Sequence, residues 1–275
     1  MYISTINLPS LKTTVEAYNL LAKKSLGQNF LLDQNITDKI VRLSLDRQGL
    51  ESLESQTVTE IGPGPGGLTR AILKQNPKKL TVIEMDDRCI AIMNDLKQIA
   101  KDQLEIINGD ALKVDIKEGH IISNLPYNIS VPLLTKWLTD INRYDSLTLM
   151  FQREVAERIT APINTKDYGR LSILAQLQCK IDKLFDIGPE CFTPAPKVWS
   201  TVLLFRPSSP MTPSQISKLE KLTALAFNQR RKMIRQSLKS IPDLDGICRR
   251  VGIETTCRPE QITPQQFLLM SEQAS

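Results

Sequence analysis

The sequence predicts an α/β domain, in which helices cover both faces of a parallel sheet, followed by a small all-α domain. Two observations lead to this prediction. From about residue 57, short runs of β-branched residues alternate with longer stretches of helical apolar spacing, which is typical of βαβ units. Near residue 207, prolines and serines interrupt this alternation, and the segments beyond them have only helical periodicity.

The expected elements follow in order along the chain. Five strands are expected, at residues 57–61, 80–83, 104–107, 120–123 and 147–151. Helices are expected at residues 68–74 and 90–100, and beyond the linker at residues 216–227 and 229–240. Ligands of such sheets bind beyond the carboxyl ends of the strands, so the residues that follow each strand are the first candidates for a site.

The composition is that of a soluble globular protein. A formal net charge of +5 over 275 residues suits contact with a polyanion without requiring it. The five cysteines are scattered, without metal-ligand spacing, and His120 is the one histidine, so we expect reduced thiols, a cytoplasmic location and no metal. No apolar run approaches the roughly 20 residues of a membrane span, and the N-terminal residues lack a signal-peptide core. We therefore expect a soluble monomer without a membrane partner.

A glycine-rich segment joins the first expected strand to the first expected helix. Gly62, Gly64 and Gly67 satisfy the fingerprint of a nucleotide-binding turn, and Glu84 follows at the end of the second strand, where a carboxylate binds ribose hydroxyls. A turn without side chains lets a nucleoside approach the backbone. The simpler alternative is a glycine turn that serves helix packing alone.

Two details favour S-adenosylmethionine over NAD as the cofactor. Pro63 and Pro65 lack the N–H groups that a pyrophosphate would need. Asp110, after the third strand, offers a second carboxylate that suits the amine of an adenine. A cofactor with a ribose and an adenine but no phosphate fits this pattern, although either carboxylate taken alone is also compatible with a solvated loop.

The tetrapeptide Asn124-Leu125-Pro126-Tyr127 follows the fourth expected strand and suits methyl transfer to an aromatic amine. The lone pair of such an amine is delocalised into the ring, so two acceptors on its hydrogens favour the geometry in which the nitrogen attacks. The side-chain oxygen of Asn124 and the carbonyl of Pro126 are the candidates, and Tyr127 can stack on the base. Catalysis would then rest on positioning and electrostatics. The alternative is an ordinary turn at the end of a strand.

Together these segments resemble those of the ribosomal RNA adenine dimethyltransferase family, and in particular its bacterial small-subunit branch. Eight motifs carry the resemblance in order, at residues 24–31, 60–64, 109–111, 124–130, 151–156, 168–172, 192–198 and 226–232. The resemblance implies a Rossmann-like class I S-adenosylmethionine-dependent methyltransferase sheet with a small C-terminal all-α domain. It implies a catalytic domain at residues 1–206, whose segment 1–31 lies over the cofactor, and a helical RNA-binding domain at residues 207–275.

The resemblance also implies roles for individual residues. The cofactor-binding residues it implies are Asn29, Leu31, Gly62, Gly64, Glu84, Asp110 and Asn124. The catalytic residues are Asn124, Pro126, Tyr127 and Phe192, the last presenting its ring to the target base unless it is a core residue. The implied substrate is a pair of adjacent adenosines in a hairpin loop near the 3′ end of small-subunit (16S) rRNA, within an immature 30S particle. Trp199 departs from the family, which usually carries an acidic residue there, and Met233 replaces a common threonine.

Basic residues suggest how RNA is held. On the helix expected at residues 229–240, Arg231, Lys232, Arg235 and Lys239 would lie within about 100° of arc, a stripe that tracks phosphates without reading sequence. A merely solvated face is the alternative. The residues expected to contact RNA are Arg153, Arg170, Arg230, Arg231, Lys232 and Arg235.

Three other functions share part of this pattern. A large-subunit rRNA dimethyltransferase has the same catalytic core, but the basic C-terminal segment favours the small-subunit enzyme. A DNA adenine or protein glutamine methyltransferase solves the same chemical problem at a planar nitrogen. A non-catalytic RNA-binding assembly factor is the third, and the intact Asn124, Tyr127, Glu84 and Asp110 argue against it.

Overall fold

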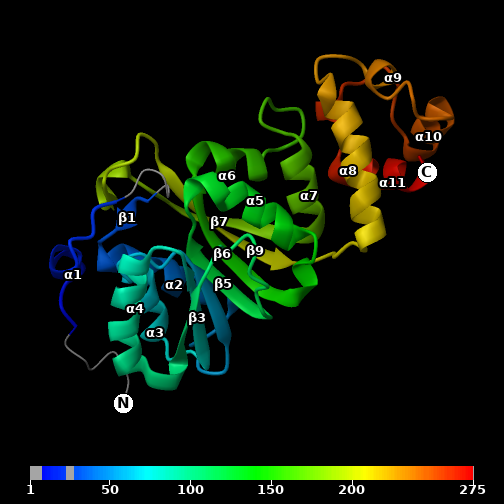
Figure 1. Ribbon diagram of the computed structural model, residues 1–275. Helices are drawn as coiled ribbons and strands as arrows, with labels where there is room; N and C mark the ends of the chain where they lie inside the picture. The colour runs from blue at the N-terminus through cyan, green and yellow to red at the C-terminus, as the bar shows by residue number, and fades with distance from the viewer. Residues whose placement is uncertain (1–7, 23–27, 275) are drawn as a thin grey trace. The chain divides into compact units, whose positions relative to one another are not determined.

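The computed structural model describes residues 8–22 and 28–274 (Figure 1). It contains two compact units. The first holds the described residues up to Leu134, with Arg143–Arg153 and Asp182–Arg206, and the second holds Thr135–Asn142, Glu154–Ile181 and the described residues from Pro207. The chain enters the helical C-terminal region at the Arg206–Pro207 junction, where the linker is expected, but the two earlier segments group with that helical region as well.

A seven-stranded sheet forms the centre of the first unit, in the order β4-β3-β2-β5-β6-β9-β7. Its strands are β2 (Thr57–Ile61), β3 (Lys79–Glu84), β4 (Leu104–Asn108), β5 (Gly119–Asn124), β6 (Tyr144–Gln152), β7 (Cys179–Ile187) and β9 (Ser200–Pro207). The five expected strands are confirmed as β2 to β6, and they run parallel. The expectation of a wholly parallel sheet is wrong, because β9 pairs antiparallel with β6.

Neither β7 nor β9 is evident from the sequence pattern. Residues 200–205 are all buried, so the start of β9 lacks the alternation of apolar and polar residues that identifies a half-exposed strand. The pair β1 (Phe30–Leu31) and β8 (Phe192–Thr193) forms a second, two-stranded sheet, in which Leu31 lies opposite Phe192.

The helices of the first unit begin at identifiable caps. They are α1 (Leu11–Ala17), α2 (Gln34–Gln48), α3 (Gly67–Leu73) and α4 (Asp87–Ala100), and α5 (Tyr127–Leu138) also starts in this unit. Asp33 caps α2 and Asp86 caps α4, each through its carboxylate and a backbone N–H of the first turn. The expected helices at residues 68–74 and 90–100 are thus confirmed as α3 and α4, with α4 starting earlier because its cap is Asp86.

The second unit is helical. Its helices are α6 (Arg153–Ile159), α7 (Arg170–Gln178), α8 (Pro213–Asn228), α9 (Ile234–Ser237), α10 (Leu244–Val251) and α11 (Pro264–Gln273). The helix expected at residues 216–227 is confirmed as α8, which starts at a Thr212–Gln215 capping box. Within the described ranges, no helix is both long and apolar enough to span a membrane.

The helix expected at residues 229–240 is wrong. Residues 229–231 form a turn, and only Ile234–Ser237 is helical. The reason is tertiary, because the N–H groups of Ile234 and Arg235 donate to the carbonyls of Cys257 (2.9 Å) and Thr255 (3.1 Å). The predicted stripe of basic residues on one helix face therefore does not exist, although Arg231, Lys232, Arg235 and Lys239 are all exposed.

Candidate active site

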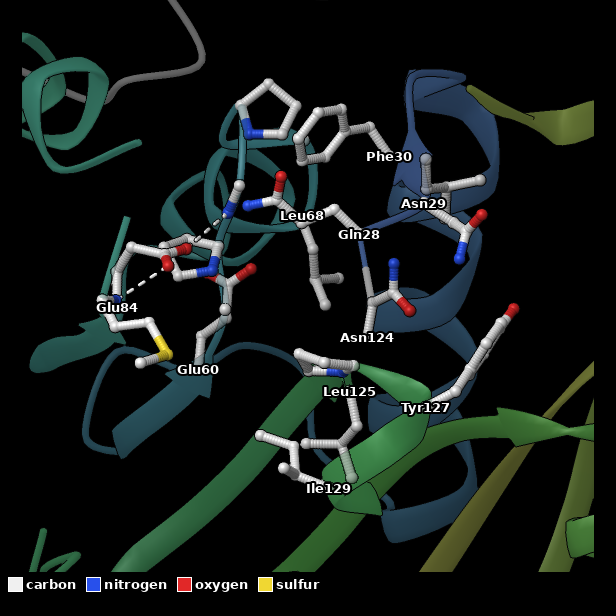
Figure 2. A pocket seen from close by; sticks show the side chains of 18 of the residues that line it. Gln28, Asn29, Phe30, Glu60, Leu68, Glu84, Asn124, Leu125, Tyr127 and Ile129 are labelled. Carbon is white, nitrogen blue, oxygen red and sulfur yellow. Dashed lines mark hydrogen bonds between the residues drawn. The ribbon is translucent and has the colours of Figure 1, made fainter. Parts of the chain in front are cut away.

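A cavity of about 290 Å³ lies in the first unit, beyond the carboxyl ends of the parallel strands (Figure 2). Its lining takes residues from the segment before α2, the turn after β2, and the ends of β3, β4 and β5. The structure thus brings every expected cofactor residue to one cavity: Asn29, Leu31, Gly62, Gly64, Glu84, Asp110 and Asn124. The expectation that segment 1–31 covers the cofactor falls partly on residues 1–7 and 23–27, which lie outside the described residues.

The glycine turn is tight, and the segment before α2 covers it closely. Gly64 has a φ of +54°, a left-handed conformation that favours glycine. A Cβ at this position would also lie 3.1 Å from the ring of Phe30. Gly62 has a φ of +65° and donates its N–H to the carbonyl of Ile83 at 2.9 Å. The turn therefore depends on the absence of side chains at both glycines.

The carboxylate of Glu84 is fixed before any ligand binds. One oxygen accepts the N–H groups of Met85 (2.8 Å) and Asp86 (2.9 Å), and the other accepts the N–H of Gly64 at 3.4 Å. Figure 2 shows the Glu84 carboxylate among the residues that line the cavity. Burial raises the pKa of Glu84, and these three donors oppose that rise. The carboxylate is thus held in a fixed orientation at the end of β3, on the lining of the cavity.

Asp86 connects Glu84 to the segment before α2. Its backbone N–H holds Glu84, and its side chain accepts the amide of Gln28 at 3.0 Å. Arg88 donates to the same carboxylate at 2.6 Å and to the carbonyl of Leu21 at 2.9 Å. The hydrogen bonds of Arg88 hold the pKa of Asp86 well below its usual range, despite burial, and that of Gln28 adds to the effect. Gln28 lines the cavity but was not singled out from the sequence.

Glu60 is a second cavity residue that the sequence pattern did not single out. It is 1% exposed, and burial raises its pKa to about 8, although the hydroxyl of Thr69 donates to its carboxyl group at 2.7 Å. Burial therefore favours the neutral, protonated form of this side chain. The sequence did contain a signal for this residue, because Glu60 is an acidic residue within a β-branched strand that leads into the glycine turn. Acidic side chains are rarely fully buried unless they are paired.

The tetrapeptide after β5 faces the same cavity. Asn124 is the last residue of β5 and Tyr127 is the first of α5, and Pro126 lies between them on the cavity lining. In Figure 2 the Asn124 amide is directed toward the segment that carries Gln28 and Asn29. The hydroxyl of Tyr127 forms a hydrogen bond of 2.7 Å with that of Ser200, which fixes the ring, and burial raises the pKa of Tyr127.

Phe192 is not brought to the cavity. It is 4% exposed, belongs to the hydrophobic core and pairs with Leu31 across β1 and β8. Leu31 does line the cavity, so Phe192 lies behind a lining residue. Its expected role at the target base stays a prediction.

The expected RNA contacts fall in both units. In the first, the exposed Arg153 forms an ion pair with Asp186 at 3.8 Å. In the second, Arg230 is half-buried and donates to Glu260 (3.2 Å) and to the carbonyl of Thr165 (2.8 Å). The remaining expected residues are exposed on the second unit: Arg170, Arg231, Lys232 and Arg235. Among the residues that the structure describes, no three or more His, Cys, Asp or Glu side chains gather as a metal site would require.

Comparisons with known proteins identify the family to which the chain belongs. The family model described as Ribosomal RNA adenine dimethylase matches residues 19–274. Proteins named Ribosomal RNA small subunit methyltransferase A are 42% identical over 270 residues in Rhodospirillum rubrum and 46% identical over 275 residues in Azorhizobium caulinodans. Each alignment covers 96% of this chain and 92% of the relative.

Solved structures show the same fold. A dimethyladenosine transferase from Plasmodium falciparum superposes with a TM-score of 0.73 at 26% identity, over 86% of this chain and 94% of that one. The 23S rRNA methyltransferase ErmE superposes with a TM-score of 0.67 at 22% identity, over 89% and 98%, a likeness of fold alone. The expected methyltransferase sheet with a helical C-terminal region is thus confirmed. The chain belongs to the ribosomal RNA adenine dimethylase family.

Proposed function

We propose that this protein transfers methyl groups from S-adenosylmethionine to the N6 amines of two adjacent adenosines in a hairpin loop near the 3′ end of small-subunit rRNA. One observation carries the proposal. Asn124, Pro126 and Tyr127 line the same cavity as the glycine turn and Glu84, so a base on the tetrapeptide and a nucleoside on the turn share one space. The relatives named small subunit methyltransferase A support the choice of substrate.

The cavity residues fit S-adenosylmethionine. Glu84, held by three N–H groups, would accept the ribose hydroxyls, and the carboxylate of Asp110 would accept the adenine amine. Gly62 and Gly64 leave the space that a nucleoside needs beside the backbone. Asn29 and Leu31 would cover the bound molecule from the segment before α2. When bound, the cofactor supplies a methyl group on a positively charged sulfur.

The tetrapeptide prepares the target amine. The side-chain oxygen of Asn124 and the carbonyl oxygen of Pro126 accept hydrogen bonds from the N6 amine. These bonds favour the geometry in which the nitrogen lone pair is no longer delocalised into the ring. The carbonyl of Pro126 also accepts the N–H of Ile129 at 3.1 Å, so its second lone pair serves the amine. Tyr127 stacks on the base, and Ser200 keeps its ring in place. These groups act by position and by hydrogen bonding, before and during transfer.

The RNA is held largely through its phosphates. Arg153, Arg170, Arg230, Arg231, Lys232 and Arg235 are the proposed contacts. An unpaired adenosine enters the cavity at little cost because it need not be unstacked from a duplex. We further propose that the protein works as a cytoplasmic monomer on immature 30S particles.

Methyl transfer to isolated ribosomal subunits tests the substrate. Unmodified small and large subunits are incubated separately with cofactor labelled in its methyl group. Label is expected in the two loop adenosines of small-subunit RNA only. Label in large-subunit RNA alone would support the large-subunit enzyme instead, and label in duplex DNA or protein alone would support the other methyltransferase classes.

Asn124→Ala tests the chemistry. Loss of the amide oxygen is expected to lower kcat by about 100-fold or more, as for other groups that act mainly on a transition state. Cofactor and RNA binding, measured by calorimetry and filter retention, should stay within a few-fold of the wild type. Unchanged turnover in this variant would refute the assigned role.

A further inference from the structure

We propose that Trp199 is a stacking platform for an unpaired RNA base next to the target adenosine. The proposal rests on the proposed function, because the stacking partner is a base of the RNA substrate. The chain has two tryptophans. Trp137 is 1% exposed, whereas Trp199 is 47% exposed, and its neighbour Val198 is 37% exposed. The exposed indole of Trp199 offers a flat aromatic face on which a base can stack.

The backbone of Trp199 is fixed close to the target site. Its carbonyl accepts the N–H of Arg153 at 2.8 Å, one position beyond the last pair of the β6–β9 ladder, Gln152 opposite Ser200. Ser200, the next residue, is fully buried and holds the hydroxyl of Tyr127 at 2.7 Å. Trp199 is therefore one residue along the chain from the group that orients the Tyr127 ring.

The exposure of the side chain decides which base it can meet. Ser200 is buried, whereas Trp199, directly before β9, is exposed. Trp199 does not line the cavity. Its ring is therefore open to a base that lies outside the cavity, next to the target base on Tyr127.

The surroundings suit RNA better than an apolar protein surface. Arg153 lies opposite Trp199, one position beyond the ladder, and is exposed. Lys197, two residues before Trp199, is exposed as well. An aromatic ring flanked by cations is the pattern by which proteins hold single-stranded nucleic acid, with stacking on the base and charge on the phosphates. Asp186 partly neutralises the charge of Arg153 through an ion pair at 3.8 Å. The same carboxylate also pairs with Lys183 at 2.8 Å, so the cluster of these three side chains keeps a net positive charge.

Kinetics on unmodified small subunits measure the contribution of the ring. Trp199→Ala is expected to raise KM for the subunits about tenfold, the loss typical of one stacked base, while kcat and cofactor affinity stay within about twofold. Trp199→Phe keeps an aromatic face and should stay within about threefold of the wild-type KM. Val198→Ala is the matched control, since it removes a neighbouring exposed apolar side chain without an aromatic face, and its KM should not change. A Trp199→Ala enzyme with wild-type KM, or equal losses for Val198→Ala, would overturn the proposal.

Photo-crosslinking identifies the partner. Trp199→p-benzoylphenylalanine is irradiated on unmodified small subunits, and a crosslink to small-subunit rRNA is expected. A crosslink to a ribosomal protein alone, or no crosslink, would overturn the assignment of a base. Failure of the proposed function would look different, because the wild-type protein would then transfer no label to small subunits.

Discussion

Tyr127 and Ser200 join the start of α5 to the start of β9 through a hydrogen bond of 2.7 Å between their hydroxyl groups. The two residues are 73 positions apart in sequence. Burial raises the pKa of Tyr127, which favours the protonated phenol that forms this bond. The antiparallel strand that the sequence pattern missed thus supplies the contact that orients the ring of Tyr127, which we propose stacks on the target base.

Removal of this contact should impair turnover without impairing cofactor binding. Ser200→Ala is expected to lower kcat about two- to tenfold, the effect of one net hydrogen bond, with the affinity for S-adenosylmethionine unchanged. Tyr127→Phe should give a similar loss, and the double variant should be no worse than either single one. Additive losses in this cycle, measured by single-turnover methyl transfer, would show that the two hydroxyls act separately.

Asp86 should control the affinity for the cofactor through its charge. Asparagine caps a helix about as well as aspartate, so Asp86→Asn preserves the start of α4 but weakens the bonds to Arg88 and Gln28. We expect roughly tenfold weaker binding of S-adenosylmethionine by calorimetry, at nearly unchanged kcat. Asp95→Asn is the control, since Asp95 contacts Tyr18 of the N-terminal region but does not line the cavity. Equal affinities in the two variants would contradict this role.

Gly64→Ala should separate strain from steric exclusion. Gly64 and Gly49 both have positive φ values, +54° and +69°, so alanine at either position costs about 1 kcal/mol or more in stability. A Cβ at Gly64 meets the Phe30 ring at 3.1 Å, whereas one at Gly49 meets nothing within 4 Å. Thermal unfolding should show a similar loss of stability in both variants, whereas calorimetry should show weaker cofactor binding only for Gly64→Ala. Equally weakened binding in both variants would contradict this prediction.

Glu60 should make the folded state less stable as the pH rises. Its pKa is raised from 4.5 to about 8 by burial, so the folded chain binds one more proton than the unfolded chain between these values. The stability that this proton contributes is complete below about pH 4.5 and is lost as the pH rises through about 8. Glu60→Gln has no such proton to lose. Its free energy of unfolding relative to the wild type should therefore increase between about pH 5 and pH 8, then level off. Urea titrations that give a constant difference would contradict the assignment.

The strands that line the cavity were predictable because their pattern is local. Each of β2, β3, β4 and β5 is a short run rich in branched residues, and each ends in a polar residue or is followed by a glycine. Parallel strands end at the same edge of a sheet, so the order of residues alone predicts that Glu84, Asp110 and Asn124 meet there.

Other features depend on contacts that the sequence pattern does not contain. The basic segment after α8 has helical spacing, yet its N–H groups at Ile234 and Arg235 bond to residues 257 and 255, which ends the helix early. The burial of Phe192 depends on the pairing of β8 with β1, between segments far apart in sequence. Glu60 could be found only by asking why an acid stands inside a buried strand.

The start of β9 gives two adjacent residues different surroundings. Ser200 is fully buried and holds the Tyr127 hydroxyl, whereas Trp199, directly before the strand, is 47% exposed. A substitution at Trp199 therefore alters the outer surface and leaves the contact between Ser200 and Tyr127 in place. Under the proposed function, the bases contacted around the target can change in this way while the chemistry at the target stays the same.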